Sequence, residues 1–217
     1  MQIHNISCCV LSVLTFALFV RALNHSSSIY DKRDTSPTLV LAFNLYWATK
    51  LVEIADTAFM MLRHRSRQIS FLHVYHHSAM LLLSDYARLY TPWPCMAFVL
   101  SINSFVHIFV YAYYWRSSLR SAVESRVNLR YKKLLTIGQM LQFVIAFIFC
   151  AIGYLQHGFC GYSLFFDFTM FAMFANFYYR AYLCRPVSGG AKELIDTGMG
   201  GGSRYDSVTG LRKGKSE

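Results

Sequence analysis

Charged residues are scarce in this sequence, and its longest apolar stretches lack the polar side that a helix on a soluble protein shows. Only 15% of the 217 residues are charged, whereas 55% are hydrophobic and 17% are aromatic. On the helices of soluble proteins, polar residues recur about every 3.6 residues and form one polar face. The segment LLTIGQMLQFVIAFIFCAIGYL is instead apolar on nearly every side. The composition therefore indicates a polytopic membrane protein and argues against a water-soluble helical domain.

Cations are missing before the first apolar stretch. A cleaved signal peptide begins with a positively charged segment, yet the nearest cation, Arg21, follows the apolar run. This arrangement favours an uncleaved membrane span over a signal peptide.

Six stretches are long enough to cross a bilayer, because a helix needs about 20 mostly apolar residues to span roughly 30 Å of hydrocarbon. We find no internal repeat and no second domain. We therefore predict an all-α fold of about six transmembrane helices in one domain over residues 1–185. The stretches lie near residues 6–23, 37–62, 70–86, 95–115, 133–154 and 162–183.

The net charge of +10 is unevenly distributed, and its distribution predicts the orientation. Cytosolic loops are enriched in Lys and Arg. Here the basic residues gather at 63–67, at 116–133 and from Arg180 onward, whereas the intervening connections hold few: Lys32, Arg33 and Arg88. The basic side is predicted to be cytosolic, and six spans then place both termini in the cytosol.

The lumenal side is predicted to carry a glycosylation site and two cysteines. Asn24 begins an Asn-His-Ser sequon there. Cys95 and Cys160 are expected in lumenal loops, where a disulfide could persist, although none of the six cysteines has CxxC spacing. The others are expected to be buried free thiols in or beside spans: Cys8, Cys9, Cys150 and Cys184.

The last segment, 186–217, is rich in Gly, Ser and charge and has no apolar period, so we expect it to be disordered. It ends in Lys213-Gly-Lys215-Ser-Glu. Lysines three and five from the carboxyl end resemble the cytosolic dilysine signal of endoplasmic reticulum proteins. The alternative is an ordinary solvated charge run.

Charges also occur inside the predicted spans. Each costs roughly 2.5 to 3.5 kcal/mol at bilayer depth, so Lys50, Glu53 and Asp56 in one span are expected to face a protein interior. At about 100° per residue, Lys50, Glu53 and Thr57 share a narrow arc of the helix. An internal salt bridge and a functional site explain these charges equally well.

Four histidines fall within two neighbouring spans. His73, His76 and His77 share one helix face because they are three and four residues apart. Asn103 and His107, also four apart, lie in the next span; the same face continues with Tyr111 and Tyr114, and the span after it adds Thr136, Gln139 and Gln142. So many polar groups indicate function. No chemistry is assigned to the other histidines: His4, His25, His64 and His157.

These groups lie at one depth. Glu53, His76, His107 and Gln142 are each nine or ten residues from the nearest basic loop residue, or roughly 14 Å at 1.5 Å per residue. We therefore predict one chamber near mid-bilayer that opens toward the basic, cytosolic loops. Such a chamber suits an amphiphile with a phosphorylated head and an acyl chain.

The polar residues of these spans resemble the motifs of the ELO family of very-long-chain fatty-acid elongases. Four motifs match in order: Lys50-x-x-Glu53-x-x-Asp56-Thr57, the HxxHH box of residues 71–77, Asn103-x-x-x-His107-x-x-x-Tyr111-x-Tyr113-Tyr114, and Thr136-x-x-Gln139-x-x-Gln142. The chain departs from the family at Val110, where Met is usual. The family also normally has seven spans, so we expect either a truncated start or a member without the first helix.

The resemblance implies a 3-oxoacyl-CoA synthase that joins acyl-CoA to malonyl-CoA and releases carbon dioxide and CoA without a metal or other cofactor. It implies His76 as the nucleophile. We expect His73, His77 and Asn103 to position this imidazole, and His107, Gln139 or Gln142 to donate to the thioester oxygen in the later step. Other residues expected to contact substrate are Lys50, Glu53, Asp56, Tyr111, Tyr114, Gln139, Gln142, Arg126, Arg130, Lys132 and Lys133. For the loop cations among these, the topology rule is an equally good explanation.

Expected partners are the two CoA substrates, the lipid bilayer of the endoplasmic reticulum, the reductases and dehydratase of the elongation cycle, and a second copy of the chain, but no nucleic acid. Two other functions stay open. Histidine boxes also bind iron in membrane desaturases and hydroxylases, although those proteins have more boxes than this one. A transporter or scaffold could likewise keep polar residues in its spans.

Overall fold

The computed structural model describes residues 2–34, 36–62, 70–119, 129–159 and 161–184. Within those ranges all regular structure is helical, and the six predicted spans coincide with helices, so the predicted all-α fold is confirmed. The elements are α1 (Gln2–His25), α2 (Pro37–Glu53), α3 (Ala55–Leu62), α4 (Phe71–Tyr90), α5 (Pro94–Leu119), α6 (Leu129–His157), α7 (Tyr162–Tyr178) and its π-helical extension η3 (Tyr179–Leu183).

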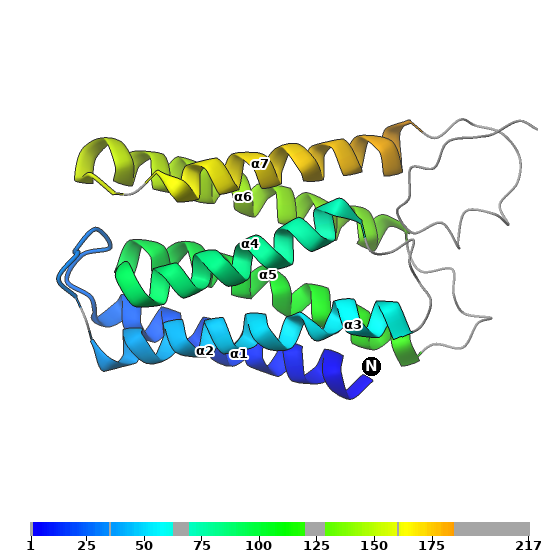
Figure 1. Ribbon diagram of the computed structural model, residues 1–217, viewed down its shortest axis with the longest axis horizontal. Coiled ribbons are helices and arrows are strands. Elements are labelled where there is room, and N and C mark those ends of the chain that lie inside the picture. Colours follow the sequence, from blue (N-terminus) through cyan, green and yellow to red (C-terminus); the bar gives the residue numbers. More distant parts are fainter. Residues whose placement is uncertain (1, 35, 63–69, 120–128, 160, 185–217) are drawn as a thin grey trace, which may run out of the picture.

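The helices run side by side along the long axis and form a ring (Figure 1). α1 packs against α2 and α5, α2 against α4, α4 against α7, α7 against α6, and α6 against α5. The α1–α2, α4–α5 and α6–α7 connections lie at one end, the connection end; the N-terminus and the ends of α3 and α7 lie at the other, the N-terminal end (Figure 1). Neighbouring helices of the ring therefore run antiparallel to each other.

Four helical units are long and apolar enough to cross a membrane: α1, Pro37–Phe59, α5, and Arg130–His157 of α6. α4 carries the three box histidines, and α7 has only 17 residues before η3. Both still present large apolar side chains outward, such as Leu82 with 71% and Phe168 with 62% of the side chain exposed. This outward face suits lipid, and the chain is a multi-pass membrane protein.

The predicted span over 37–62 is two helices, because the chain tightens at Ile54. The Ile54 amide donates to Leu51 O at 3.3 Å, and the Thr57 amide donates to Ile54 O at 3.0 Å. Bonds to the third preceding residue wind the chain more tightly than an α-helix does. The turn changes the direction in which Asp56 and Thr57 point relative to Glu53.

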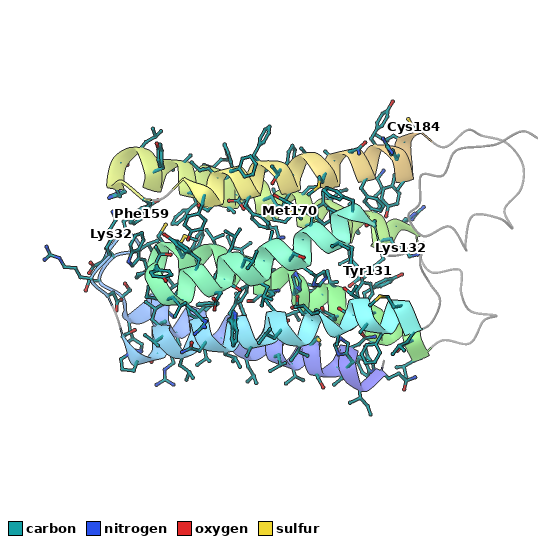
Figure 2. The ribbon with its side chains drawn as sticks, viewed as in Figure 1. Lys32, Tyr131, Lys132, Phe159, Met170 and Cys184 are labelled. Carbon is teal, nitrogen blue, oxygen red and sulfur yellow. The ribbon has the colours of Figure 1, made fainter. Side chains whose placement is uncertain are left out.

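Aromatic stacking and one lysine fasten the connection end. The Tyr30 ring stacks on His157 with centroids 4.2 Å apart. Lys32 Nζ donates to Gly158 O at 3.0 Å and lies 4.7 Å from the ring centre of Phe159. Gly158 has φ of 61°, the left-handed conformation that ends α6. Figure 2 shows Lys32 and Phe159 at this end and Lys132 at the opposite one.

The expectation for Cys95 was wrong. Cys95 is the second residue of α5, is 1% exposed and is a free thiol. It lies in a helix and not in the expected loop because α5 begins at Pro94. Cys160 lies outside the described residues. The expected burial holds for Cys8 and Cys150, whereas Cys9 is half-buried and Cys184 is exposed.

Candidate active site

A buried ion pair occupies the last turn of α2. Lys50 Nζ lies 2.9 and 3.0 Å from the two carboxylate oxygens of Glu53. The side chains are 3% and 0% exposed, and Nζ also lies 4.9 Å from the Tyr46 ring centre. Each charge therefore compensates the other inside the ring. The ammonium predicted to bind a substrate anion is already paired with Glu53.

Glu53 also faces α5. His107 Nδ1 lies 3.2 Å from Glu53 Oε1, which is an ion-pair distance. No described residue meets this nitrogen in hydrogen-bond geometry. A carboxylate beside Nδ1 favours a proton on that atom and leaves Nε2 as the basic nitrogen. The α2 carboxylate thereby orients the chemistry of an α5 imidazole.

The histidine box lies in the first two turns of α4. The helix begins after Ser70, whose hydroxyl accepts a hydrogen bond from the His73 amide at 3.2 Å. His73 Nε2 and Thr57 Oγ1 are 2.9 Å apart, so the residue after the α2–α3 turn holds the first imidazole. The His73 and His77 rings lie 4.3 Å apart.

The ring nitrogens of His76 and His77 have no hydrogen-bond partner in the described part of the chain. The His76 ring meets the edge of His77 at 5.2 Å and lies nearly parallel to His107 at 6.1 Å. The structure therefore brings the four predicted histidines together. It leaves His76 and His77 available to a ligand, and of these two His76 is the one that lies against His107.

The predicted amide side chains lie on α5 and α6. Asn103 Oδ1 accepts a hydrogen bond from Tyr46 OH at 2.8 Å, and both residues are buried. Gln142 is 5% exposed, and its Oε1 has no partner among the described residues. Gln139 is half-buried, while the Thr136 hydroxyl donates to Lys132 O within its own helix at 3.0 Å.

Asp56 connects three helices at the N-terminal end. Tyr111 OH donates to Asp56 Oδ2 at 2.8 Å, and His4 Nε2 lies 2.8 Å from Asp56 Oδ1. The Tyr111 ring in turn lies 5.8 Å from that of His107. Sequence reasoning assigned His4 no chemistry. The signal in the sequence was the spacing of His4 and Cys8, which are four residues apart. In the structure both lie in α1, and their side chains are 3.6 Å apart.

The described loop cations that were expected to contact substrate lie at the start of α6. Arg130, Lys132 and Lys133 are exposed on the first turns of α6, with Lys133 Nζ 5.6 Å from the Tyr178 ring centre. Arg126 lies outside the described residues. Tyr114 is 47% exposed and contacts the Tyr111 ring at 6.0 Å.

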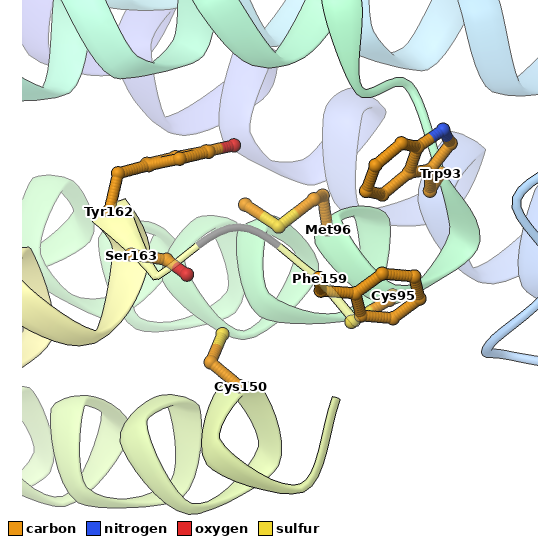
Figure 3. Close-up of a pocket in the computed structure, with 7 residues that line it drawn as sticks. All are labelled: Trp93, Cys95, Met96, Cys150, Phe159, Tyr162 and Ser163. Atoms are coloured by element: carbon orange, nitrogen blue, oxygen red, sulfur yellow. The ribbon is translucent and has the colours of Figure 1, made fainter. Parts of the chain in front are cut away.

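Two cavities continue from the amides toward the connection end. The larger has an empty volume of about 540 Å³, and its lining includes Asn103, Gln142 and Asp167. The smaller, of about 250 Å³, is bounded by Trp93, Cys95, Cys150 and Phe159 (Figure 3). Met96, Tyr162 and Ser163 line both. Sequence reasoning missed Asp167, a buried acid in the last predicted span.

The arrangement has the parts of an acyl-transfer site. An unpaired imidazole can attack a carbonyl carbon, and a second imidazole with a carboxylate behind it can carry a proton or stabilise an oxyanion. An apolar cavity beside them can hold a hydrocarbon chain.

Comparison with known proteins agrees with this chemistry. The GNS1/SUR4 family, ELO, matches residues 1–189. Very long chain fatty acid elongase 5 of Homo sapiens is 36% identical over 156 residues, covering 70% of this chain and 51% of the relative. The same-named protein of Macaca fascicularis is 34% identical over 168 residues, covering 75% and 55%. Very long chain fatty acid elongase F of Drosophila melanogaster is 35% identical over 164 residues, covering 70% and 61%. The chain thus spans about half the length of the curated relatives it matches.

Breaking the buried ion pair tests its place in the structure. Lys50→Met leaves the Glu53 carboxylate without its main partner and should lower the free energy of unfolding by about 3 to 5 kcal/mol. The double variant Lys50→Met/Glu53→Gln should recover much of that loss. Thermal unfolding in detergent measures both. Asp85→Asn, which breaks a partly exposed pair with Arg88, is the control and should cost about 1 kcal/mol or less. A double variant less stable than Lys50→Met would contradict the pairing.

Proposed function

The chain belongs to the GNS1/SUR4 family, and on that premise we propose that it is the condensing enzyme of fatty-acid elongation. It joins a long-chain acyl-CoA to malonyl-CoA and gives 3-oxoacyl-CoA, carbon dioxide and CoA. The observation that carries the proposal is His76, an imidazole without a hydrogen-bond partner in the described residues, stacked on His107, whose Nδ1 faces the buried Glu53 carboxylate.

The first step transfers the acyl group to the protein. A nitrogen of His76 attacks the thioester carbonyl, the carbon–sulfur bond breaks, and CoA leaves with the proton that the imidazole gives up. His77 meets the edge of the His76 ring, and His73 lies against His77, so the two residues keep the orientation of the nucleophile. The product of this step is an acyl-imidazole.

The second step forms the new carbon–carbon bond. Malonyl-CoA loses carbon dioxide, and the resulting enolate carbon attacks the acyl carbon. The carbon–nitrogen bond to His76 breaks, and the imidazole takes up a proton from water to replace the one that left with CoA. Charge on the thioester oxygen needs donors, and we assign this role to His107, Asn103 and Gln142.

The remaining residues position these groups and admit substrate. Lys50 supports Glu53, and Asp56 supports Tyr111, each through a short polar contact. We assign CoA phosphate and malonyl carboxylate recognition to the cations expected in the basic loop, namely Arg126, Arg130, Lys132 and Lys133. Their exposure on α6 supports this role for the last three.

We propose that the reaction uses no metal. Among the described residues, no three His, Cys, Asp or Glu side chains gather as a metal site would require. No observation favours the desaturase or hydroxylase alternative, or the transporter alternative. Purified protein with stoichiometric iron, or product formation that needs oxygen, would replace the elongase proposal.

The proposed location is the endoplasmic reticulum membrane, with both termini in the cytosol. Connections at alternate ends of the ring support the orientation. The proposed cycle partners are the reductases and dehydratase that process the 3-oxoacyl product. The C-terminal tail, with its dilysine-type ending, lies outside the described residues.

Two histidine variants should separate the steps. His76→Ala should lower condensation by about three orders of magnitude or more, because the nucleophile is gone. His107→Ala should be similarly impaired in condensation but should still form the acyl-enzyme. With acyl-CoA alone, the native protein and His107→Ala should release CoA and retain a hydroxylamine-sensitive acyl group, and His76→Ala should do neither. Undiminished CoA release by His76→Ala would exclude this nucleophile.

Glycosylation mapping tests the orientation. A sequon inserted between Arg116 and Lys133 should stay unmodified, because that loop is proposed to be cytosolic, whereas one inserted among residues 26–34 should gain a glycan. Electrophoretic mobility before and after glycosidase treatment reports the result. The reverse pattern would invert the topology and remove the cytosolic route for malonyl-CoA.

The tail signal can be tested by itself. Replacing Lys213 and Lys215 with Ser should let the protein leave the endoplasmic reticulum, because a receptor reads both lysines. Fluorescence microscopy of a protein tagged in the 26–34 connection measures the change. Replacement of Arg204 and Arg212 with Ser is the control and should have no effect. Unchanged residence of the lysine variant would leave the tail as a plain charge run.

A further inference from the structure

The larger cavity is lined by buried polar atoms that lack hydrogen-bond partners among the described residues. Its walls are mostly apolar, with Met80, Leu83 and Phe143 among them. Two buried atoms on this lining lack a partner among the described residues: Gln142 Oε1 on α6 and Asp167 Oδ2 on α7. Their side chains are 5% and 3% exposed. Buried acceptors of this kind normally receive a hydrogen bond.

Contacts between sequence neighbours connect the two acceptors with the helix that carries the reacting imidazole. The cavity-lining residues Met80 and Ala87 follow His76 on α4 by four and eleven residues, which is about 6 and 16 Å along the helix. Phe166, directly before Asp167, stacks on Tyr75, directly before His76, at 6.5 Å. Phe166 also meets Phe143, directly after Gln142, at 6.2 Å. An acyl chain that extends from His76 into this cavity therefore passes both acceptors.

Two other polar groups on the same lining have partners. The Ser84 hydroxyl donates to Leu81 O at 3.0 Å, and Asn103 Oδ1 accepts from Tyr46 OH. The fully buried polar atoms of the lining that lack a partner among the described residues are Gln142 Oε1 and Asp167 Oδ2. A plain hydrocarbon offers no donor and would leave both atoms unpaired, whereas an alcohol group would donate to one of them.

We propose that this cavity selects acyl chains that carry a hydroxyl group, with Asp167 as the residue that determines the selection. The inference rests on the proposed function and names the substrate class of that site. The hydroxyl lies on the part of the chain near the thioester, where Asp167 and Gln142 face the cavity. The rest of the chain continues into the smaller cavity, whose wall is largely apolar beyond Ser163, with Trp93, Met96 and Phe159 (Figure 3).

The native protein provides the deciding measurement. Acyl-CoAs of one length, either unsubstituted or with a hydroxyl at successive positions, are each condensed with malonyl-CoA by the purified full chain. The kcat/KM of the best hydroxyacyl-CoA should exceed that of the unsubstituted one by about tenfold or more. An unsubstituted chain that reacts equally well or better overturns the proposal.

Variants at Asp167 then test the residue. Asp167→Leu removes the acceptor and should reduce the ratio of the two kcat/KM values by about tenfold, mainly by raising the value for the unsubstituted chain. Asp167→Asn keeps an acceptor oxygen and should keep the preference. Ser84→Ala alters a satisfied polar group on the same wall and should leave the ratio unchanged. An unchanged ratio in folded Asp167→Leu, or a ratio lost in Ser84→Ala, removes the role of Asp167.

Binding separates this inference from the proposed function. If the native protein condenses none of the acyl-CoAs, the proposed function fails, and equilibrium binding of the same compounds decides the selection alone. Tighter binding of a hydroxyacyl-CoA, weakened by Asp167→Leu but not by Ser84→Ala, upholds the cavity assignment. Equal binding of all of them overturns it. If Asp167→Leu does not fold, the native preference and Asp167→Asn carry the test.

Discussion

The Glu53 carboxylate is fully buried in a helix ring whose outer face is apolar, so its charge must be compensated by neighbouring side chains. An unpaired buried charge costs several kcal/mol even after relaxation. Lys50 supplies the main compensation from one turn earlier, and His107 approaches from α5. This requirement fixes the rotation of α2 toward α5, and with it the place of the imidazole that stacks on His76.

The spans and the shared depth of the site could be predicted because both follow from regular helix geometry. Histidines three and four residues apart must share a face, and equal distances from the basic loops must give similar depths. Those rules placed His73, His76, His77 and His107 correctly together. They needed no knowledge of how one helix packs on another.

Features that depend on irregular backbone or on helix pairing could not be predicted in this way. The turn at Ile54 departs from ideal helix geometry, so a uniform 100° step does not describe the residues that follow Glu53. His4 reaches Asp56 only because α1 packs beside α5, and Asp167 reaches the cavity only because α7 packs beside α4 and α6. Cys95 was misplaced because α5 starts at Pro94. In each case the missing information was the position of a neighbour.

Substitution of Ile54 should be easier for this protein to accommodate over evolutionary time than a change of length between Glu53 and Asp56. One residue inserted there would rotate everything after it by about 100°, and would turn Asp56 from Tyr111 and Thr57 from His73 while leaving the Lys50–Glu53 pair intact. Ile54 itself contributes backbone bonds that many residue types could make. The turn is therefore expected to vary in residue type but not in length.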